Sequence, residues 1–146
     1  MADGARMPAD VAAILARALA EVPWSDVASA YLFGSQARGR AHRESDVDVG
    51  VLLRWDLHPA RRDRFEARLR LIGFLGPALG GREIDVVVLN DAPPPLASRI
   101  VKEGRRVFCS APEADHAFVR DVQLRAADLV PFLRRTRQVK LAAIRR

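Results

Sequence analysis

The chain has 146 residues, of which 49% are hydrophobic, which is typical of one globular domain and argues against a disordered protein. Its single cysteine, Cys109, excludes an internal disulfide and a thiolate metal cluster. The net charge of +6 belongs to the C-terminal segment, since residues 118–146 hold eight Lys/Arg and two Asp/Glu and the rest of the chain is balanced. Such a segment could dock on an acidic protein, bind nucleic acid or form a solvated helical face.

The first half of the chain predicts one helix and two strands. Apolar residues at helical spacing predict a helix within residues 8–23. The apolar run 27–33 predicts a strand that ends in a tight turn at Gly34. The polar stretch 36–43 predicts a helical turn and a loop, and alternating valines predict a second strand over 47–53.

A long helix is predicted over residues 61–75. Its apolar stripe is expected to consist of Phe65, Leu69 and Ile72. Its many arginines predict a solvated face, although they could also line the approach of a substrate. These arginines are Arg61, Arg62, Arg64, Arg68 and Arg70.

The second half of the chain continues the alternation of strands and helices. We expect a strand over 84–89, a helix over 96–103 that ends at Gly104, and a strand over 106–109. This order of elements predicts an α/β (α+β) fold with a central sheet.

The expected organisation is a single domain, residues 1–146. Its core is expected over about 25–110, with a basic helical tail over about 114–146. Pro131 predicts a kink or a break in that tail. No apolar run approaches the roughly 20 residues that cross a bilayer, and we expect a cytoplasmic protein.

Asp46 and Asp48 flank the start of the second predicted strand. Residues two apart on a strand project from the same face, roughly 6–7 Å apart. Two such carboxylates repel one another unless a cation neutralises them, and oxygen ligands favour Mg²⁺ or Mn²⁺ over zinc. The pair therefore indicates a divalent-metal site, although a solvent-facing edge strand could also carry it.

Asp85 lies in the third predicted strand, which is otherwise apolar. If that strand neighbours the second, its carboxylate completes a cluster of three with Asp46 and Asp48. Such a cluster can hold two divalent ions about 3.5–4 Å apart, the arrangement used for in-line nucleotidyl transfer. The alternative is a charged strand end that pairs with one of the arginines.

Gly34 and Ser35 form the turn that leads toward the aspartate pair. Glycine lets the backbone approach a triphosphate closely, and N–H groups at a helix start attract anions. The Gly-Ser dipeptide is also common in ordinary turns. Only its position, shortly before the strand that carries the aspartates, favours a phosphate-binding role. Arg38, about one turn past Ser35, could reach a phosphate or lie on the surface.

Together these residues form the pattern G-S-x₁₀-D-x-D, followed by an Asp on a later strand. The pattern resembles the minimal nucleotidyltransferases, a small branch of the superfamily related to DNA polymerase β. The resemblance implies a nucleotidyltransferase fold with a small mixed sheet flanked by helices. It also implies ATP as a substrate and two Mg²⁺ ions, with Mn²⁺ as a substitute.

The resemblance gives each motif residue a role. Gly34 and Ser35 would hold the β- and γ-phosphates of the nucleotide, with Arg38 as a further nucleotide-binding residue. Asp46 and Asp48 would ligate the metal ions. Asp85 would share the metal beside the attacking hydroxyl and help to deprotonate it.

The short chain leaves no room for the nucleic-acid-gripping domains of polymerases. What remains resembles the antitoxins of this superfamily, which are encoded beside a HEPN-type ribonuclease toxin. That resemblance implies transfer of AMP from ATP to a tyrosine hydroxyl of the toxin, which inactivates it, within a hetero-oligomer. Two alternatives stay open: an antitoxin that only binds its toxin, with vestigial catalysis, and a nucleotidyltransferase that acts on an RNA end or a small molecule.

Overall fold

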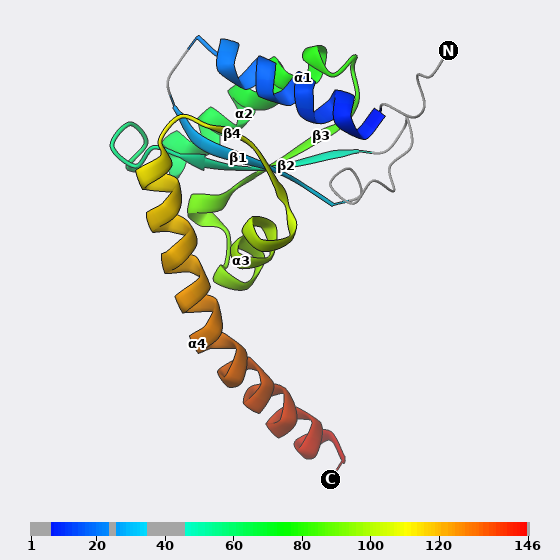
Figure 1. The fold of residues 1–146 in the computed structure, drawn as a ribbon. Coiled ribbons are helices and arrows are strands. Elements are labelled where there is room, and N and C mark those ends of the chain that lie inside the picture. The colour runs from blue at the N-terminus through cyan, green and yellow to red at the C-terminus, as the bar shows by residue number, and fades with distance from the viewer. Residues whose placement is uncertain (1–6, 24–25, 35–45, 146) are drawn as a thin grey trace.

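In the part of the chain that the computed structural model describes, residues 7–23, 26–34 and 46–145, four strands form one mixed sheet (Figure 1). The strands run in the order β3-β2-β1-β4. They are β1 (Val27–Phe33), β2 (Val47–Leu53), β3 (Ile84–Val88) and β4 (Arg105–Cys109). β1 is antiparallel to both of its neighbours, whereas β2 and β3 are parallel. The predicted mixed sheet is confirmed, and β1 and β2 have their predicted bounds.

Helices cover both faces of this sheet (Figure 1). They are α1 (Met7–Glu21), α2 (Arg61–Ala78), α3 (Pro94–Glu103) and α4 (Pro112–Arg145), with a short 3-10 helix, η2 (Leu89–Asp91), after β3. α1 and α2 share one hydrophobic cluster with the sheet, and α3 and the start of α4 share a second cluster on the other face. The central strands are therefore buried on both sides, which explains their nearly continuous apolar sequences.

Side chains along β2 alternate between the two faces of the sheet, and this alternation decides which face Asp48 occupies. Val47, Val49 and Val51 belong to the cluster under α1 and α2, and Leu52 belongs to the cluster under α3. Asp48 therefore lies on the α3 face of the sheet. At Gly50, on the same face, an added Cβ would lie 2.9 Å from Ile100 Cγ2, so glycine lets α3 pack closely against the strand.

The predicted apolar stripe of α2 is wrong for two of its three members. Phe65 is 54% exposed and Leu69 is 50% exposed, and Ile72 only borders the core. The buried side chains of the helix are Arg64, Ala67, Leu71 and Leu75. This face is turned by about one residue from the predicted one, because the small Ala67 lets the helix lie close to the sheet and Arg64 has polar partners that offset its burial.

The helix α4 does not break at Pro131, contrary to that part of the expectation. A proline removes one backbone hydrogen bond and crowds the preceding turn, but the intact turns on both sides can maintain the helix. The C-terminal half of α4 projects away from the domain (Figure 1). Within the described residues, no helix is long and apolar enough to cross a membrane.

A buried carboxylate anchors the first turn of α4 to the sheet. Asp115 is 1% exposed and accepts hydrogen bonds from Ser29 Oγ at 2.7 Å, Tyr31 OH at 2.6 Å and Arg106 Nη1 at 2.9 Å. Burial raises the pKa of Asp115, but hydrogen bonds from Tyr31, Ser29 and Arg106 outweigh it and leave that pKa lowered. Burial and the same carboxylate raise the pKa of Tyr31 well above its usual range.

Candidate functional site

Gly34 ends β1 directly beside Asp48. Phe33 pairs with Asp48 in the antiparallel ladder, so the next residue of the chain lies against the aspartate side chain. Gly34 has a φ of +75°, a left-handed conformation that favours glycine. A Cβ at this position would collide with Asp48 Oδ2. The glycine therefore provides both the turn and the space that the Asp48 carboxylate occupies.

Asp48 and Asp85 lie directly opposite one another in the parallel ladder between β2 and β3. Both belong to the α3 face, because Val86 and Val88 alternate with Asp85 and pack under α2. Burial raises the pKa of Asp48, and the charges of Asp85 and Asp46 raise it further. The strand register thus brings two of the three predicted carboxylates together.

The third predicted carboxylate, Asp46, precedes β2 and is exposed. After burial and the charge of Asp85, the charge of Asp46 also raises the pKa of Asp48. Within the described residues, no group of three or more His, Cys, Asp or Glu side chains is arranged to hold a metal ion. The donor chemistry nevertheless suits a hard divalent cation, because adjacent carboxylates that repel one another are stabilised by positive charge between them.

Arg68 contacts the strand that carries Asp85. Its Nη2 lies 3.6 Å from Asp85 Oδ1, and its Nε donates a hydrogen bond of 2.6 Å to the Val86 carbonyl. Since α2 covers the opposite face, the arginine reaches around the outer edge of β3. The sequence predicts a solvated face for Arg68, or a place along the approach of a substrate, and it gives no signal for a partner on a distant strand.

Two predicted nucleotide-binding residues, Ser35 and Arg38, lie outside the described residues, as does the polar stretch 36–43. The roles given to them remain predictions. Gly34 is the one member of the nucleotide-binding set in the described ranges, and its turn ends beside the aspartate strand.

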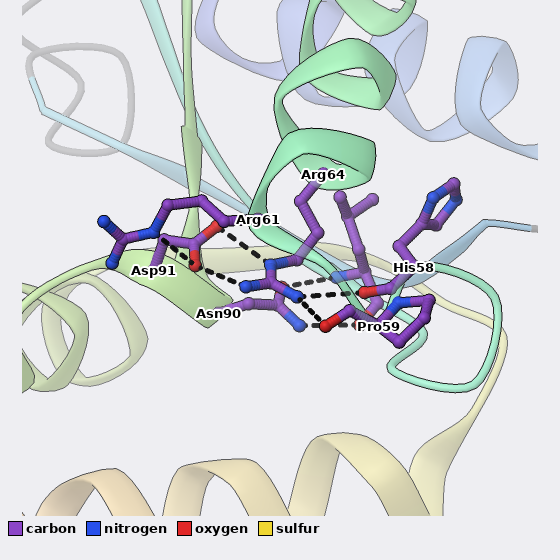
Figure 2. A network of polar contacts seen from close by, with 7 residues as sticks. His58, Pro59, Arg61, Arg64, Asn90 and Asp91 are labelled. Carbon is purple, nitrogen blue, oxygen red and sulfur yellow. Dashed lines mark hydrogen bonds and ion pairs between the residues drawn. The ribbon is translucent and has the colours of Figure 1, made fainter.

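A second polar network lies at the opposite end of β2 and β3 (Figure 2). Arg64, 7% exposed, donates to both carboxylate oxygens of Asp91 at 2.9 and 2.8 Å and to the carbonyls of His58 and Pro59 at 3.0 Å each. Its guanidinium carbon lies 4.9 Å from the ring centroid of Trp55. The hydrogen bond from Arg64 lowers the pKa of Asp91 against the opposing effect of burial. This network links the loop after β2 to η2, and the sequence carries no signal that separates Arg64 from the neighbouring arginines of α2.

A groove of about 800 Å³ borders this second network and α4. Trp55, Asn90, Phe118 and Arg120 are among its lining residues. Neither Gly34 nor any of the three predicted catalytic aspartates lines it. This groove and the carboxylate pair are therefore separate features.

Comparison with known proteins agrees with this arrangement. Residues 17–113 match the family described as polymerase beta, nucleotidyltransferase. Protein adenylyltransferase MntA from Shewanella oneidensis is 35% identical over 78 residues, which are 53% of this chain and 51% of that protein. The chain thus matches about half the length of this curated relative.

Solved structures share the fold at lower identity. A toxin–antitoxin crystal structure with AMP-PNP has a TM-score of 0.61 at 23% identity and covers 92% of this chain and 98% of the matched chain. A complex of the tri-AMPylated Shewanella oneidensis HEPN toxin with its MNT antitoxin has a TM-score of 0.57 at 19% identity and covers 95% and 99% of the two chains. The extent of the family match, which includes Gly34 and all three aspartates, shows that the chain belongs to the polymerase beta nucleotidyltransferase family.

Proposed function

We propose that this nucleotidyltransferase is an antitoxin-type protein adenylyltransferase. It transfers AMP from ATP to a tyrosine hydroxyl of a HEPN-type ribonuclease toxin and so neutralises that toxin. The observation that carries the proposal is the pairing of Asp48 with Asp85 beside the Gly34 turn. The similarity to protein adenylyltransferase MntA supports the protein acceptor.

The residue roles are those that the family resemblance implies, and the positions of Gly34, Asp48 and Asp85 support them. The turn at Gly34 brings backbone against the carboxylate pair, so a triphosphate held by Gly34 and Ser35 would have its α-phosphate near Asp48. Asp46, Asp48 and Asp85 would hold two Mg²⁺ ions, which supply neutralisation of the charge on the reacting phosphate and the leaving pyrophosphate. Asp85, on the outer strand, would orient the acceptor hydroxyl and accept its proton.

The direct test is AMP transfer to the neighbouring gene product. The purified chain is incubated with α-labelled ATP, Mg²⁺ and the HEPN-type protein encoded beside it. Label is expected on a tyrosine of that protein with the wild type, and not with Asp46→Asn/Asp48→Asn or Asp85→Asn. Asp56→Asn, an exposed aspartate on the loop after β2, is the matched control and should transfer normally. Absence of label with the wild type contradicts the proposal.

The alternative is an antitoxin that only binds its toxin. It is favoured by the ion pair between Arg68 and Asp85, which gives Asp85 a partner other than a metal ion. An experiment in cells that express the toxin distinguishes AMP transfer from binding alone. If Asp46→Asn/Asp48→Asn still protects these cells as well as the wild type does, then binding alone neutralises the toxin.

A further inference from the structure

A groove of about 410 Å³ follows the outer edge of the sheet beside β3. β3 is an edge strand, so half of its backbone polar groups point away from β2. The floor of the groove is formed by Val86, Val87 and Val88, and its sides come from α2 and from the segment that leads into α3. We call this hollow the β3-edge groove, and Leu69 lies one helical turn after its lining residue Phe65 on α2.

Both sides of the β3-edge groove expose large apolar side chains. Phe65 is 54% exposed and Leu69 is 50% exposed on α2, and Leu96 is 39% exposed on α3. None of these side chains belongs to either hydrophobic cluster. Exposed apolar side chains on both sides of an edge strand are typical of a surface that receives an extended peptide segment.

One lining residue, Arg68, connects the groove with the proposed reaction site. Arg68 lines it, donates to the Val86 carbonyl in its floor and lies 3.6 Å from Asp85. A chain that lies along β3 therefore reaches, at the start of that strand, the carboxylate proposed to receive the acceptor proton.

The charge beside the groove indicates the chemistry of its occupant. The side chains of Arg61 and Arg62, on the turn of α2 next to the groove, are 82% and 88% exposed. Arg61 lies 3.6 Å from Asp91 and Arg62 lies 3.6 Å from Glu66, and both distances are those of loose ion pairs. A partner with acidic residues near its apolar contacts would therefore be complementary to this margin.

We propose that the β3-edge groove binds the acceptor-bearing segment of the HEPN-type partner as an extended chain. This inference rests on the proposed function. Apolar side chains of the segment pack against Phe65, Leu69 and Leu96, its acidic residues face the arginines of α2, and its tyrosine reaches Asp85. The groove thereby selects the acceptor, whereas the Gly34 turn holds the nucleotide.

The binding test uses exposed leucines of equal exposure. Leu69→Glu, one turn after the lining residue Phe65, is compared with Leu57→Glu on the loop after β2, since these side chains are 50% and 49% exposed. Affinity for the intact HEPN-type partner is measured by calorimetry, and ATP binding is measured separately. Leu69→Glu and Phe65→Glu are expected to weaken partner binding about tenfold or more, because an ionised carboxylate would be placed in an apolar contact. Leu57→Glu should bind the partner like the wild type, and all variants should bind ATP equally.

A cross-linking test identifies which part of the partner occupies the groove. The photoreactive residue p-benzoylphenylalanine replaces Phe65, and the cross-linked peptide is mapped by mass spectrometry. A cross-link to the peptide that contains the acceptor tyrosine supports the proposal, and a cross-link confined to another region overturns it. The proposal is also overturned if Leu69→Glu binds the partner as tightly as the wild type, or if the chain alone is a dimer that Leu69→Glu converts to a monomer. If the wild type binds the partner but transfers no AMP, the proposed function fails, and the Leu69→Glu affinity still decides whether the groove is the binding surface.

Discussion

Asp48 and Asp85 are direct partners across the parallel strands β2 and β3, and both lie on the face of the sheet that α3 covers. This arrangement places negative charge beside negative charge in a partly buried position. Burial, Asp85 and Asp46 together raise the pKa of Asp48. The fold is therefore less stable with both aspartates ionised than it would be without this repulsion.

Replacement of Asp48 by Asn is expected to raise the melting temperature in the absence of divalent cations at neutral pH. A raised folded-state pKa means that the native state binds more protons than the unfolded chain, so wild-type stability falls as pH rises through the interval above the unfolded pKa of about 4. The advantage of Asp48→Asn should thus be absent below that interval and fully present above it. Thermal unfolding from pH 3 to 8, with EDTA present, measures this difference.

Asp56→Asn is the control for this experiment, because Asp56 is exposed on the loop after β2. Its melting temperature should follow that of the wild type at every pH. Addition of Mg²⁺ should stabilise the wild type more than Asp48→Asn, since a cation that binds the native state raises its stability. A variant Asp48→Asn that is less stable than the wild type at neutral pH would contradict the repulsion.

Substitution of Gly34 by Ala should impair AMP transfer more than it impairs folding. Gly80 provides the matched control, because its φ of +72° resembles the +75° of Gly34 but an added Cβ would meet no atom within 4 Å. Both substitutions should cost about 1–2 kcal/mol of stability from left-handed backbone strain. At Gly34 the new Cβ also displaces the Asp48 carboxylate. AMP transfer should therefore fall at least about tenfold, because small displacements of catalytic groups cause rate losses of this size or more. Urea unfolding and AMP transfer are measured on both variants, and equal activity of the two would argue against this contact.

The strands of the site were predictable because their apolar runs end at clear boundaries. β1 ends at the Gly34 turn, and β2 begins after Asp46, where valines start to alternate. The proximity of Asp85 to Asp48 could be predicted only on the condition that their strands are neighbours, since sequence alone does not decide which strands pair or in which register. β2 and β3 are separated in the sequence by the whole of α2, and their parallel pairing in the structure places Asp85 opposite Asp48.

The two arginine contacts could not be predicted for a related reason. Arg64 and Arg68 resemble Arg61 and Arg62 in type and spacing, so sequence gives no reason to bury one and expose another. Their environments depend on Asp91 and Val86, which lie 27 and 18 residues further along the chain, respectively. The apolar stripe of α2 was misplaced for the same reason, because Arg64 and the small Ala67 occupy the buried face.

Asp115 should be the most sensitive polar residue of the core. Its carboxylate accepts three hydrogen bonds, so Asp115→Ala leaves Ser29, Tyr31 and Arg106 without their acceptor and should cost about 3–5 kcal/mol. Because the pKa of Asp115 is lowered in the native state, this stabilisation is present above the unfolded pKa of about 4 and is lost as pH falls through the folded value. Asp121→Ala on the same helix, where the side chain is 57% exposed and pairs with Arg125, should change stability by less than about 0.5 kcal/mol. Equal losses in urea unfolding of the two variants would refute the anchoring role.

Arg64 should not tolerate lysine, although the substitution keeps its charge. A lysine ammonium cannot make the paired hydrogen bonds to both Asp91 oxygens while it also bonds the carbonyls of His58 and Pro59. The buried acceptors left unpaired should reduce the free energy of unfolding by about 2–3 kcal/mol. Arg62→Lys is the matched control, since its side chain is 88% exposed and its contact with Glu66 is 3.6 Å, and it should change stability by less than about 0.5 kcal/mol. Urea unfolding measures both variants. Similar stabilities for Arg64→Lys and Arg62→Lys would show that charge alone, and not the geometry of the guanidinium, holds the loop after β2 against η2.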